Sequence, residues 1–391
     1  MQDKQVVELL GGLAREPQGQ PRLDVAGAIR TGKRRTLRNR TAAAAAAAAA
    51  VLAVTAVVAA GVSISLPEQR PAQVAGPVLN PAPAKAPLAQ VTSCTPEILP
   101  LPDGAASSSI AAMDPTGTYL VGKADETPAI WKDGVFEARI PAPGLNSRPV
   151  AVNSSGIAVG YGGLDSVDKE SWAYAAGKVY PLKASAPVAV SGIDEAGRAA
   201  GTRIDGLRAR AVVWESVMDP ATDLPIPDGY VHSSAIGVFA DGTVLGTVGT
   251  EKQLVRGLSI VQGDYYLWTP DHRGGTFLEG QDGKHAKMSV LRAGDGWLYG
   301  LTNGGAFARY EVATKRWSTF PTGLLQPENV NAQGWVVGED DRTGKVFLYD
   351  GRKLITLPTA GSETANTVPA ISADGSLLAG TLGTAAVWRC S

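Results

Sequence analysis

The feature that most constrains the fold of this sequence is a motif repeated seven times over its last three-quarters. Each copy has an apolar segment, a polar turn ending in glycine, and a second apolar segment reaching another glycine four or five residues later, as in AVNSSGIAVG and NVNAQGWVVG. The copies are spaced by 38 to 54 residues, near the length of one β-propeller blade. The first glycines of the copies are Gly117, Gly156, Gly197, Gly242, Gly296, Gly334 and Gly375.

Each repeat parses into four short strands. Strand A precedes the polar turn, whose glycine supplies the positive φ that a tight turn requires. Strand B follows, strand C carries an aromatic residue, and strand D closes the unit with segments such as KVYPL. The alternation of apolar and polar positions is typical of half-buried strands, so we predict an all-β fold, a seven-bladed β-propeller. The strand C aromatics, whose recurrence predicts packing between blades, are Trp131, Tyr174, Trp214, Trp268, Tyr310, Tyr349 and Trp388.

The repeated pattern of an apolar residue, Asn or Asp, and two spaced glycines resembles the HAF-type extracellular repeat proteins, and bacterial propellers more generally. The resemblance covers about residues 105–391. Phe239, Ala293 and Ser372 replace the turn Asn or Asp in three units, and the His-Ala-Phe triplet is absent. The resemblance implies an extracellular repeat architecture and little about function.

Two cysteines lie at opposite ends of the repeat region. The seventh unit supplies strands A to C and lacks D, whereas the chain before the first unit has a spare segment, EILPL at 97–101. That segment fits as strand D of the last blade, so Cys94 and Cys390 would flank a C–D turn. We therefore predict a Cys94–Cys390 disulfide that closes the ring, with two free thiols as the alternative.

A basic segment and an uncharged one precede the repeats. Residues 1–41 carry nine Lys or Arg against four Asp or Glu, and residues 41–66 carry no charge. About 20 apolar residues span a bilayer, and the basic flank stays inside. We predict a cytoplasmic segment 1–40, a transmembrane helix 41–66 and an exported C-terminal body in the cell membrane. A cleaved signal peptide and a soluble alanine helix are the alternatives.

A proline-rich stretch separates the predicted span from the repeats. Residues 67–93 contain six prolines among Ala, Gln and Val, which predicts a semi-rigid linker before a propeller at 94–391. Strands alternate in direction, so the A–B and C–D turns share one face and the B–C and D–A loops share the other. The linker enters at a C–D position, so we expect the B–C and D–A loops to face away from the membrane.

Loops on one face are the usual contact surface of a propeller, and we expect the outward face to carry the ligand site. The B–C connection is longest in the fourth unit, where we expect a loop over 247–264. The candidate ligand-face residues are Asn146, Arg148, Asp165, Asp168, Arg203, Asp205, Arg208, Arg210, Arg256, Asp340, Asp341 and Arg342.

Catalytic sequence motifs are missing. The sequence has no G-x-S-x-G and no H-E-x-x-H, and His232, His272 and His285 are isolated, the first two in expected loops. We therefore expect no enzyme, catalytic residue, metal site or cofactor. The net charge is −1 overall and −6 after residue 41, which argues against nucleic acid as a partner.

The resulting interpretation is a surface-displayed propeller of an actinobacterial type of cell that binds or scaffolds. Its partner would be a surface protein or a cell-wall glycan, and it would sense the state of the envelope. One alternative is a hydrolase or lyase that acts on glycans through carboxylates of the central channel. Another is a transmembrane signal relay through residues 1–40.

Overall fold

The computed structural model describes residue 88 and residues 90–163, 170–206, 208–255, 258–280, 284–285, 288–294, 296–302, 307–319, 325–340, 343–359 and 366–391. The predicted cytoplasmic segment 1–40, the predicted span 41–66 and most of the predicted linker lie outside these residues. In the part of the chain that is described, no helix has the length and apolar character needed to cross a membrane.

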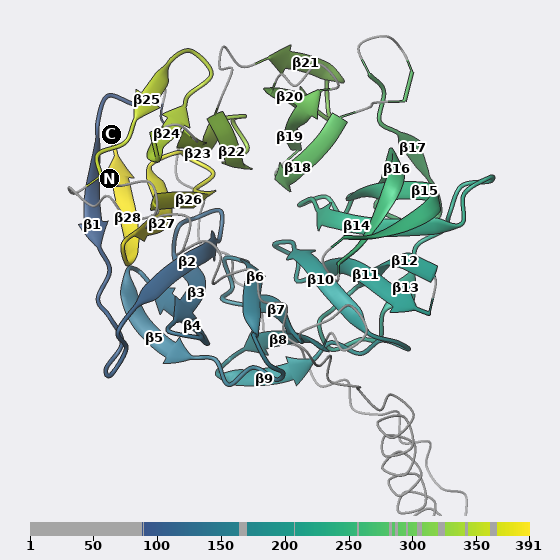
Figure 1. Ribbon diagram of the computed structural model, residues 1–391, viewed down its shortest axis with the longest axis horizontal. Coiled ribbons are helices and arrows are strands. Elements are labelled where there is room, and N and C mark those ends of the chain that lie inside the picture. The colour runs from purple at the N-terminus through teal and green to yellow at the C-terminus, as the bar shows by residue number, and fades with distance from the viewer. Residues whose placement is uncertain are drawn as a thin grey trace, which may run out of the picture. The chain divides into compact units, whose positions relative to one another are not determined.

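The described strands form seven antiparallel sheets of four strands each, arranged as blades around a central axis (Figure 1). Strand A of each blade lies nearest the axis, and strands B, C and D follow outward, which confirms the predicted seven-bladed β-propeller. The first blade consists of β2 (Ser108–Met113), β3 (Tyr119–Ala124), β4 (Thr127–Lys132) and β5 (Val135–Arg139).

The next five blades repeat this order along the chain. The second has β6 (Arg148–Val152), β7 (Ala158–Gly162), β8 (Glu170–Ala175) and β9 (Lys178–Pro181), and the third has β10 (Val188–Ile193), β11 (Ala199–Asp205), β12 (Arg208–Trp214) and β13 (Thr222–Asp223). The fourth has β14 (His232–Val238), β15 (Val244–Val255), β16 (Leu258–Trp268) and β17 (Gly275–Phe277). The fifth has β18 (Met288–Gly294), β19 (Trp297–Thr302), β20 (Phe307–Glu311) and β21 (Arg316–Thr319), and the sixth has β22 (Leu325–Val330), β23 (Val336–Asp340), β24 (Lys345–Tyr349) and β25 (Leu354–Thr356).

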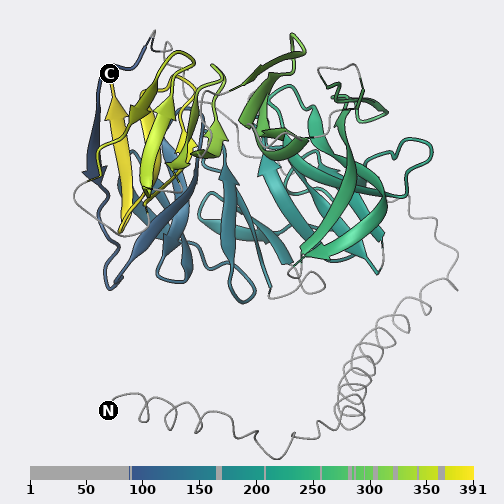
Figure 2. The same ribbon diagram turned by 45° about the horizontal axis from the view of Figure 1, so that its top comes forward.

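The seventh blade takes its outer strand from the other end of the repeat region. It consists of β26 (Asn366–Ile371), β27 (Leu377–Leu382), β28 (Ala385–Cys390) and β1 (Cys94–Ile98). Figures 1 and 2 both show β1 lying along β28. The register runs from Cys94 opposite Cys390 to Ile98 opposite Ala386, and Arg389 forms an ion pair with Glu97 at 2.8 Å.

The predicted disulfide between Cys94 and Cys390 is confirmed, with the two Cα atoms 4.1 Å apart. The outer strand begins at Cys94 and not at the predicted position 97, because residues 94–96 continue the ladder opposite residues 388–390. The residues just before it also contact the last blade. Val91 is fully buried, the Thr92 hydroxyl donates to the Ser391 carbonyl at 2.7 Å, and the Ser391 amide donates to Ser93. The ring is therefore closed by a covalent bond and by paired backbone.

The first glycine of every repeat lies in the A–B turn with the positive φ that the sequence predicts, between 71° and 92°. In the second blade the turn residue three positions earlier, Asn153, caps the turn. Asn153 accepts hydrogen bonds from the amides of Ser155 and Ile157, and its side-chain amide donates to the Asp194 carbonyl in the next blade at 3.0 Å. Asparagine at this position therefore links adjacent blades as well as shaping its own turn.

Asp114 occupies the same turn position in the first blade, and its replacement by asparagine gives a pH-dependent prediction. Burial raises the pKa of Asp114 above its ordinary 3.8, against hydrogen bonds from Thr116 and Tyr119. A carboxyl with a raised pKa in the folded state stabilises at acidic pH, and that stability is lost as pH rises through the folded pKa. We expect Asp114→Asn to raise the free energy of unfolding at pH 7, because it removes the buried charge.

The same gain should shrink as the pH falls toward 3.8, because the wild-type carboxyl is then neutral as well. Urea denaturation of both proteins between pH 4 and pH 8 would measure it. An equal difference at every pH would mean that the effect comes from the added amide donor and not from the removed charge.

The buried hydrophobic side chains of the described residues form seven clusters, and each cluster is built from two neighbouring blades. The cluster of the seventh and first blades joins Leu99 and Val387 to Ile110 and Trp131. This confirms that the aromatic positions of strand C pack between blades. In the second blade Tyr174 packs there as expected, but Trp172 is the more deeply buried ring.

Four of the strand C tryptophans also donate their indole N–H to a backbone carbonyl just after strand D of the preceding blade. Each of these rings is fully buried. A buried carbonyl without a hydrogen bond would be costly, and the indole N–H satisfies it. Because donor and acceptor belong to different blades, the bond also links adjacent blades. The pairs are Trp131 to Pro100 at 3.5 Å, Trp214 to Lys183 at 2.9 Å, Trp268 to Pro225 at 2.7 Å and Trp388 to Pro358 at 2.9 Å.

Replacing Trp214 with phenylalanine tests this link. The variant loses the N–H donor and part of the buried ring, so we expect the free energy of unfolding to fall by about 2–4 kcal/mol. Trp297→Phe is the matched control, because its N–H donates to the Ala332 carbonyl at 3.0 Å from a half-buried ring. Guanidinium denaturation should show a clearly smaller loss for the control, and equal losses would contradict the proposed role of burial.

The long B–C connection of the fourth unit is not the predicted loop over 247–264. Strands β15 and β16 continue instead as a paired hairpin up to Val255 opposite Leu258, with a register shift between Val248 and Glu251. Backbone pairing is satisfied along the insertion, which extended apolar and β-branched residues favour. The histidine expected in a loop at position 232 is the first residue of β14, whereas His272 lies in a turn as expected.

Candidate functional site

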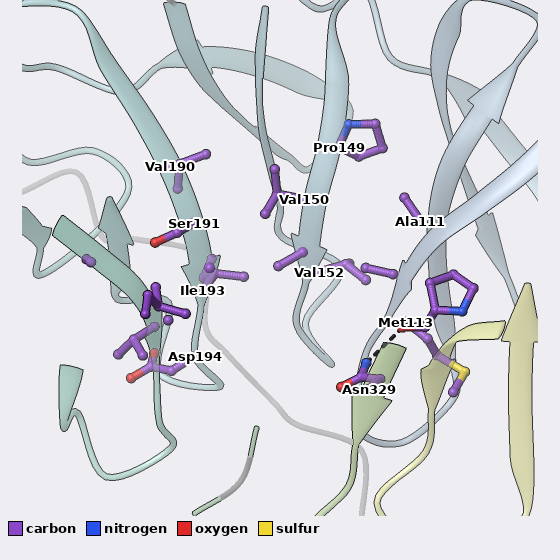
Figure 3. A pocket seen from close by; sticks show the side chains of 18 of the residues that line it. Ala111, Met113, Pro149, Val150, Val152, Val190, Ser191, Ile193, Asp194 and Asn329 are labelled. Carbon is purple, nitrogen blue, oxygen red and sulfur yellow. Dashed lines mark hydrogen bonds between the residues drawn. The ribbon is translucent and has the colours of Figure 1, made fainter. Parts of the chain in front are cut away.

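A cavity of about 520 Å³ lies on the axis of the propeller, against the innermost strands. Each of these strands carries a register shift in its middle, and the bulged residues Ala111, Val150, Ser191 and Ile236 all line the cavity. Figure 3 shows several of these side chains around the shared space. The wall is made largely of small apolar residues, so it carries few reactive groups, and a ligand would be recognised there mainly by its shape.

The second glycine of the repeats explains how the bulges are accommodated. In the first blade, a Cβ at Gly122 would lie 2.8 Å from the Cα of Ile110 and nearer still to the Ser109 carbonyl oxygen. The same overlap with the strand A carbonyl occurs at Gly246 and Gly380. The strand B glycine therefore makes room for the bulged strand that forms the cavity wall.

The carboxylates of the cavity wall, Asp194 and Glu195, and Glu328 in the bulge of β22 are held by neighbouring groups. Asp194 forms an ion pair with Arg198, with 2.7 Å between Oδ2 and Nε, and burial raises the pKa of Asp194 despite that partner. Glu195 accepts hydrogen bonds from the amide and the hydroxyl of Ser154. Glu328, on β22, accepts from the Val368 amide of the next blade at 3.1 Å. These three carboxylates therefore support the A–B turns and the bulged strands.

One mouth of the cavity carries Arg148, a sequence candidate. Its guanidinium lies 4.7 Å from the ring centroid of Tyr161, the residue opposite it in the β6–β7 ladder, and both line the cavity. Asn146 is exposed in the preceding D–A loop with a φ of 52°, next to Leu145, whose side chain is 69% exposed. The cavity wall here presents a cation stacked over an aromatic ring.

The other described candidates lie on the B–C side of the third and sixth blades. Arg203 is not free, because it donates to Asp223 at 2.7 Å and to the Ser185 hydroxyl. Asp205, Arg208 and Arg210 lie on the β11–β12 hairpin, and Asp340 ends β23. The candidates outside the described residues are Asp165, Asp168, Arg256, Asp341 and Arg342.

A second cavity, of about 410 Å³, lies beside the third and fourth blades and brings two of these candidates together. It is lined by Arg208, Arg210, Tyr230, Val231 and His232. In the described part of the chain, no carboxylate lies within ion-pair distance of either arginine. This cavity therefore has a cationic wall.

A chain of hydrogen bonds fixes the far wall of the second cavity. The Tyr230 hydroxyl donates to Asp264 at 2.5 Å, and this bond raises the pKa of Tyr230 to about 12. The same Asp264 oxygen lies 3.1 Å from Nδ1 of His285, whose ring stacks on Phe277 with 4.0 Å between centroids. Tyr230 is thereby held as a neutral, oriented ring.

Sequence reasoning did not find Tyr161, Tyr230 or Asp264 as parts of a site. The three lie on β7, in a D–A loop and on β16, and no short motif joins them. In the described residues, no group of three or more His, Cys, Asp or Glu side chains is placed to hold a metal ion.

Comparison with known proteins gives similarity in fold alone. The chain matches no protein family and no curated protein. The solved structure of a streptogramin B lyase is 11% identical with a TM-score of 0.52, over 76% of this chain and 98% of that chain. The structure of U3-55K (15% identical, TM-score 0.48, 76% and 98% covered) and that of the computationally designed Ika8 protein (14%, 0.44, 75% and 98%) are similar as well.

Proposed function

We propose that the protein is a non-enzymatic binding or scaffolding propeller, displayed outside the cell by a single membrane span. The N-terminal segment 1–40 would be cytoplasmic, and the propeller would face the envelope of an actinobacterial type of cell, in keeping with the resemblance to HAF-type repeat proteins. Its partner would be a surface protein or a cell-wall glycan.

The observation that carries the proposal is that the acidic groups at the axial cavity are engaged in the fold, whereas basic groups of the outward face can contact a ligand. The two described carboxylates that line the axial cavity, Asp194 and Glu195, are engaged in an ion pair and hydrogen bonds that support the fold. An acid–base pair for glycan cleavage needs carboxylates that can reach the substrate. The cations of the outward face, Arg148, Arg208 and Arg210, lie instead at cavity mouths, where they can contact a ligand.

The disulfide supports an exported location. Disulfides form and persist in oxidising compartments and are rare in the cytosol. Cys94 and Cys390 are the only cysteines of the chain, and they are paired. The uncharged segment 41–66 after a basic flank supplies the means of export and of anchoring.

Co-sedimentation of the oxidised full-length protein, kept in detergent, with purified cell walls tests the proposal. We expect saturable binding that free wall glycan competes away. Matched walls treated with protease separate a glycan partner from a surface protein. Absence of binding to walls and to intact cells would overturn the proposal, as would release of cleaved glycan by the protein.

A further inference from the structure

The two arginines of the second cavity lie where the third blade leaves a strand edge uncovered. Strand β13 pairs with β12 only at Val212 and Val213, so it stops short of positions 208–210. The neighbouring blade covers that edge instead. The Ala209 amide donates to Nδ1 of His232 at 3.4 Å, and the Ala211 amide donates to the Ser233 hydroxyl at 2.9 Å.

Buried side chains alternate along β12 with side chains that solvent or a ligand can reach. Ala209 and Ala211 are fully buried against the fourth blade, whereas Arg208 is exposed and Arg210 is half-buried. Residues two apart on a strand share a face and lie roughly 6.6 Å apart along it. The strand therefore places the two arginines on one face, with their Cα atoms at the fixed spacing of alternate strand positions.

The nearby charges leave these two arginines uncompensated. Arg203, which lies opposite Arg210 in the ladder, is neutralised by Asp223. Asp205 lies opposite Arg208 and forms no ion pair with it in the described structure. Like charges opposite one another are unfavourable unless something offsets them. Two adjacent cations that form no ion pair within the described structure are suited to an external anion.

We propose that Arg208 and Arg210 form a binding site for the phosphate groups of an anionic polymer of the cell envelope. The proposal rests on the proposed function. Guanidinium forks donate paired hydrogen bonds to phosphate oxygens, and a phosphate can accept from two forks at once. Tyr230, oriented by Asp264, and Val231 form the apolar side of the cavity, against which the carbon skeleton of such a polymer would pack.

Because the propeller region has a negative net charge, a polyanion would be bound at a local site and not through a general electrostatic attraction. The chain after residue 41 carries −6, so the propeller as a whole should repel a polyanion. Binding of a phosphate polymer by the propeller, as distinct from the basic segment 1–41, must then depend on a local cationic surface such as this cavity. In the proposed orientation the cavity faces away from the membrane, which favours a wall polymer over a lipid headgroup.

The test measures binding of inorganic polyphosphate to the full-length protein in detergent by titration calorimetry at low salt. We expect saturable binding that weakens as salt is added. The double variant Arg208→Gln/Arg210→Gln should bind at least about tenfold more weakly. Arg352→Gln, at an exposed arginine on a C–D turn, is the matched control and should bind like the wild type. Polyglutamate at equal charge should bind more weakly than polyphosphate.

Asp205→Asn adds a readout that a purely structural role would not produce. Removing this exposed carboxylate beside Arg208 should strengthen polyphosphate binding about two- to fivefold. It also keeps the proposal testable if the double variant fails to fold. No polyphosphate binding by the wild type, equal binding by the double variant, or no gain from Asp205→Asn would overturn the site.

The same variants separate this site from the proposed function. If the wild type and the double variant sediment equally with cell walls, the phosphate site is wrong and the wall-binding function stands. If polyphosphate binding depends on the two arginines but no wall or cell binding is found, the site stands and the proposed function falls.

Discussion

Replacing Cys94 and Cys390 together with serine is expected to lower the free energy of unfolding by as much as about 5–6 kcal/mol. The disulfide joins residues 296 positions apart, and restricting so long a loop removes much of the entropy of the unfolded chain. The expected loss is a large part of the total for an ordinary domain. The outer strand β1, held by five paired residues and one surface ion pair, should separate first.

Guanidinium denaturation of the oxidised wild type and the double serine variant measures the loss. Reductant should lower the midpoint of the wild type and leave that of the variant unchanged, which controls for other effects of the reductant. Hydrogen exchange should show faster exchange in β1 and β28 of the variant than in β10 and β11. Equal midpoints for the oxidised wild type and the variant would mean that backbone pairing alone closes the ring.

Gly122→Ala is expected to be strongly destabilising although it adds only a methyl group. The added Cβ would meet the backbone of the bulged strand at Ser109 and Ile110, and backbone cannot move aside as a flexible side chain can. Overpacking of a tight core costs about 1–3 kcal/mol, and a clash with a strand paired on its other side should reach or exceed that. We expect loss of soluble protein or a fall of at least about 3 kcal/mol in the free energy of unfolding.

Gly274→Ala is the matched control for this prediction. No atom lies within 4 Å of a Cβ at Gly274, and its φ is outside the positive range. Its midpoint of denaturation should stay close to that of the wild type. If Gly122→Ala were equally well tolerated, the strand B glycines would have to be explained by something other than room for the bulge.

The sequence predicted the architecture well because the repeats contain their own local signals. A tight A–B turn requires a glycine with positive φ, and Gly156 and the first glycines of the other six repeats all have it. The Cys94–Cys390 pair followed from counting strands, because one unit lacked strand D and the chain had one to spare. Such inferences need only neighbouring residues and the rule that a propeller closes.

The candidate site was predicted less well, because it depends on contacts between blades. Arg208 and Arg210 were among eleven charged candidates, and nothing local distinguished them from Arg203. What distinguishes them is Asp223, which neutralises Arg203, and the shortness of β13. A sequence shows which side chains carry charge, but which partners they meet on other strands, within a blade or across a blade boundary, depends on the folded ring.

The pairing of β1 with β28 also sets the timing of folding during synthesis. At roughly 5–20 residues per second, the 296 residues between Cys94 and Cys390 take about 15–60 s to appear. For that interval the first strand made has no partner, and its edge is open to other chains. Pro96 and Glu97 in the middle of β1 are residues that discourage such pairing. Pairing with β28, which is synthesised after the other strands of the ring, thus covers the exposed edge of β1.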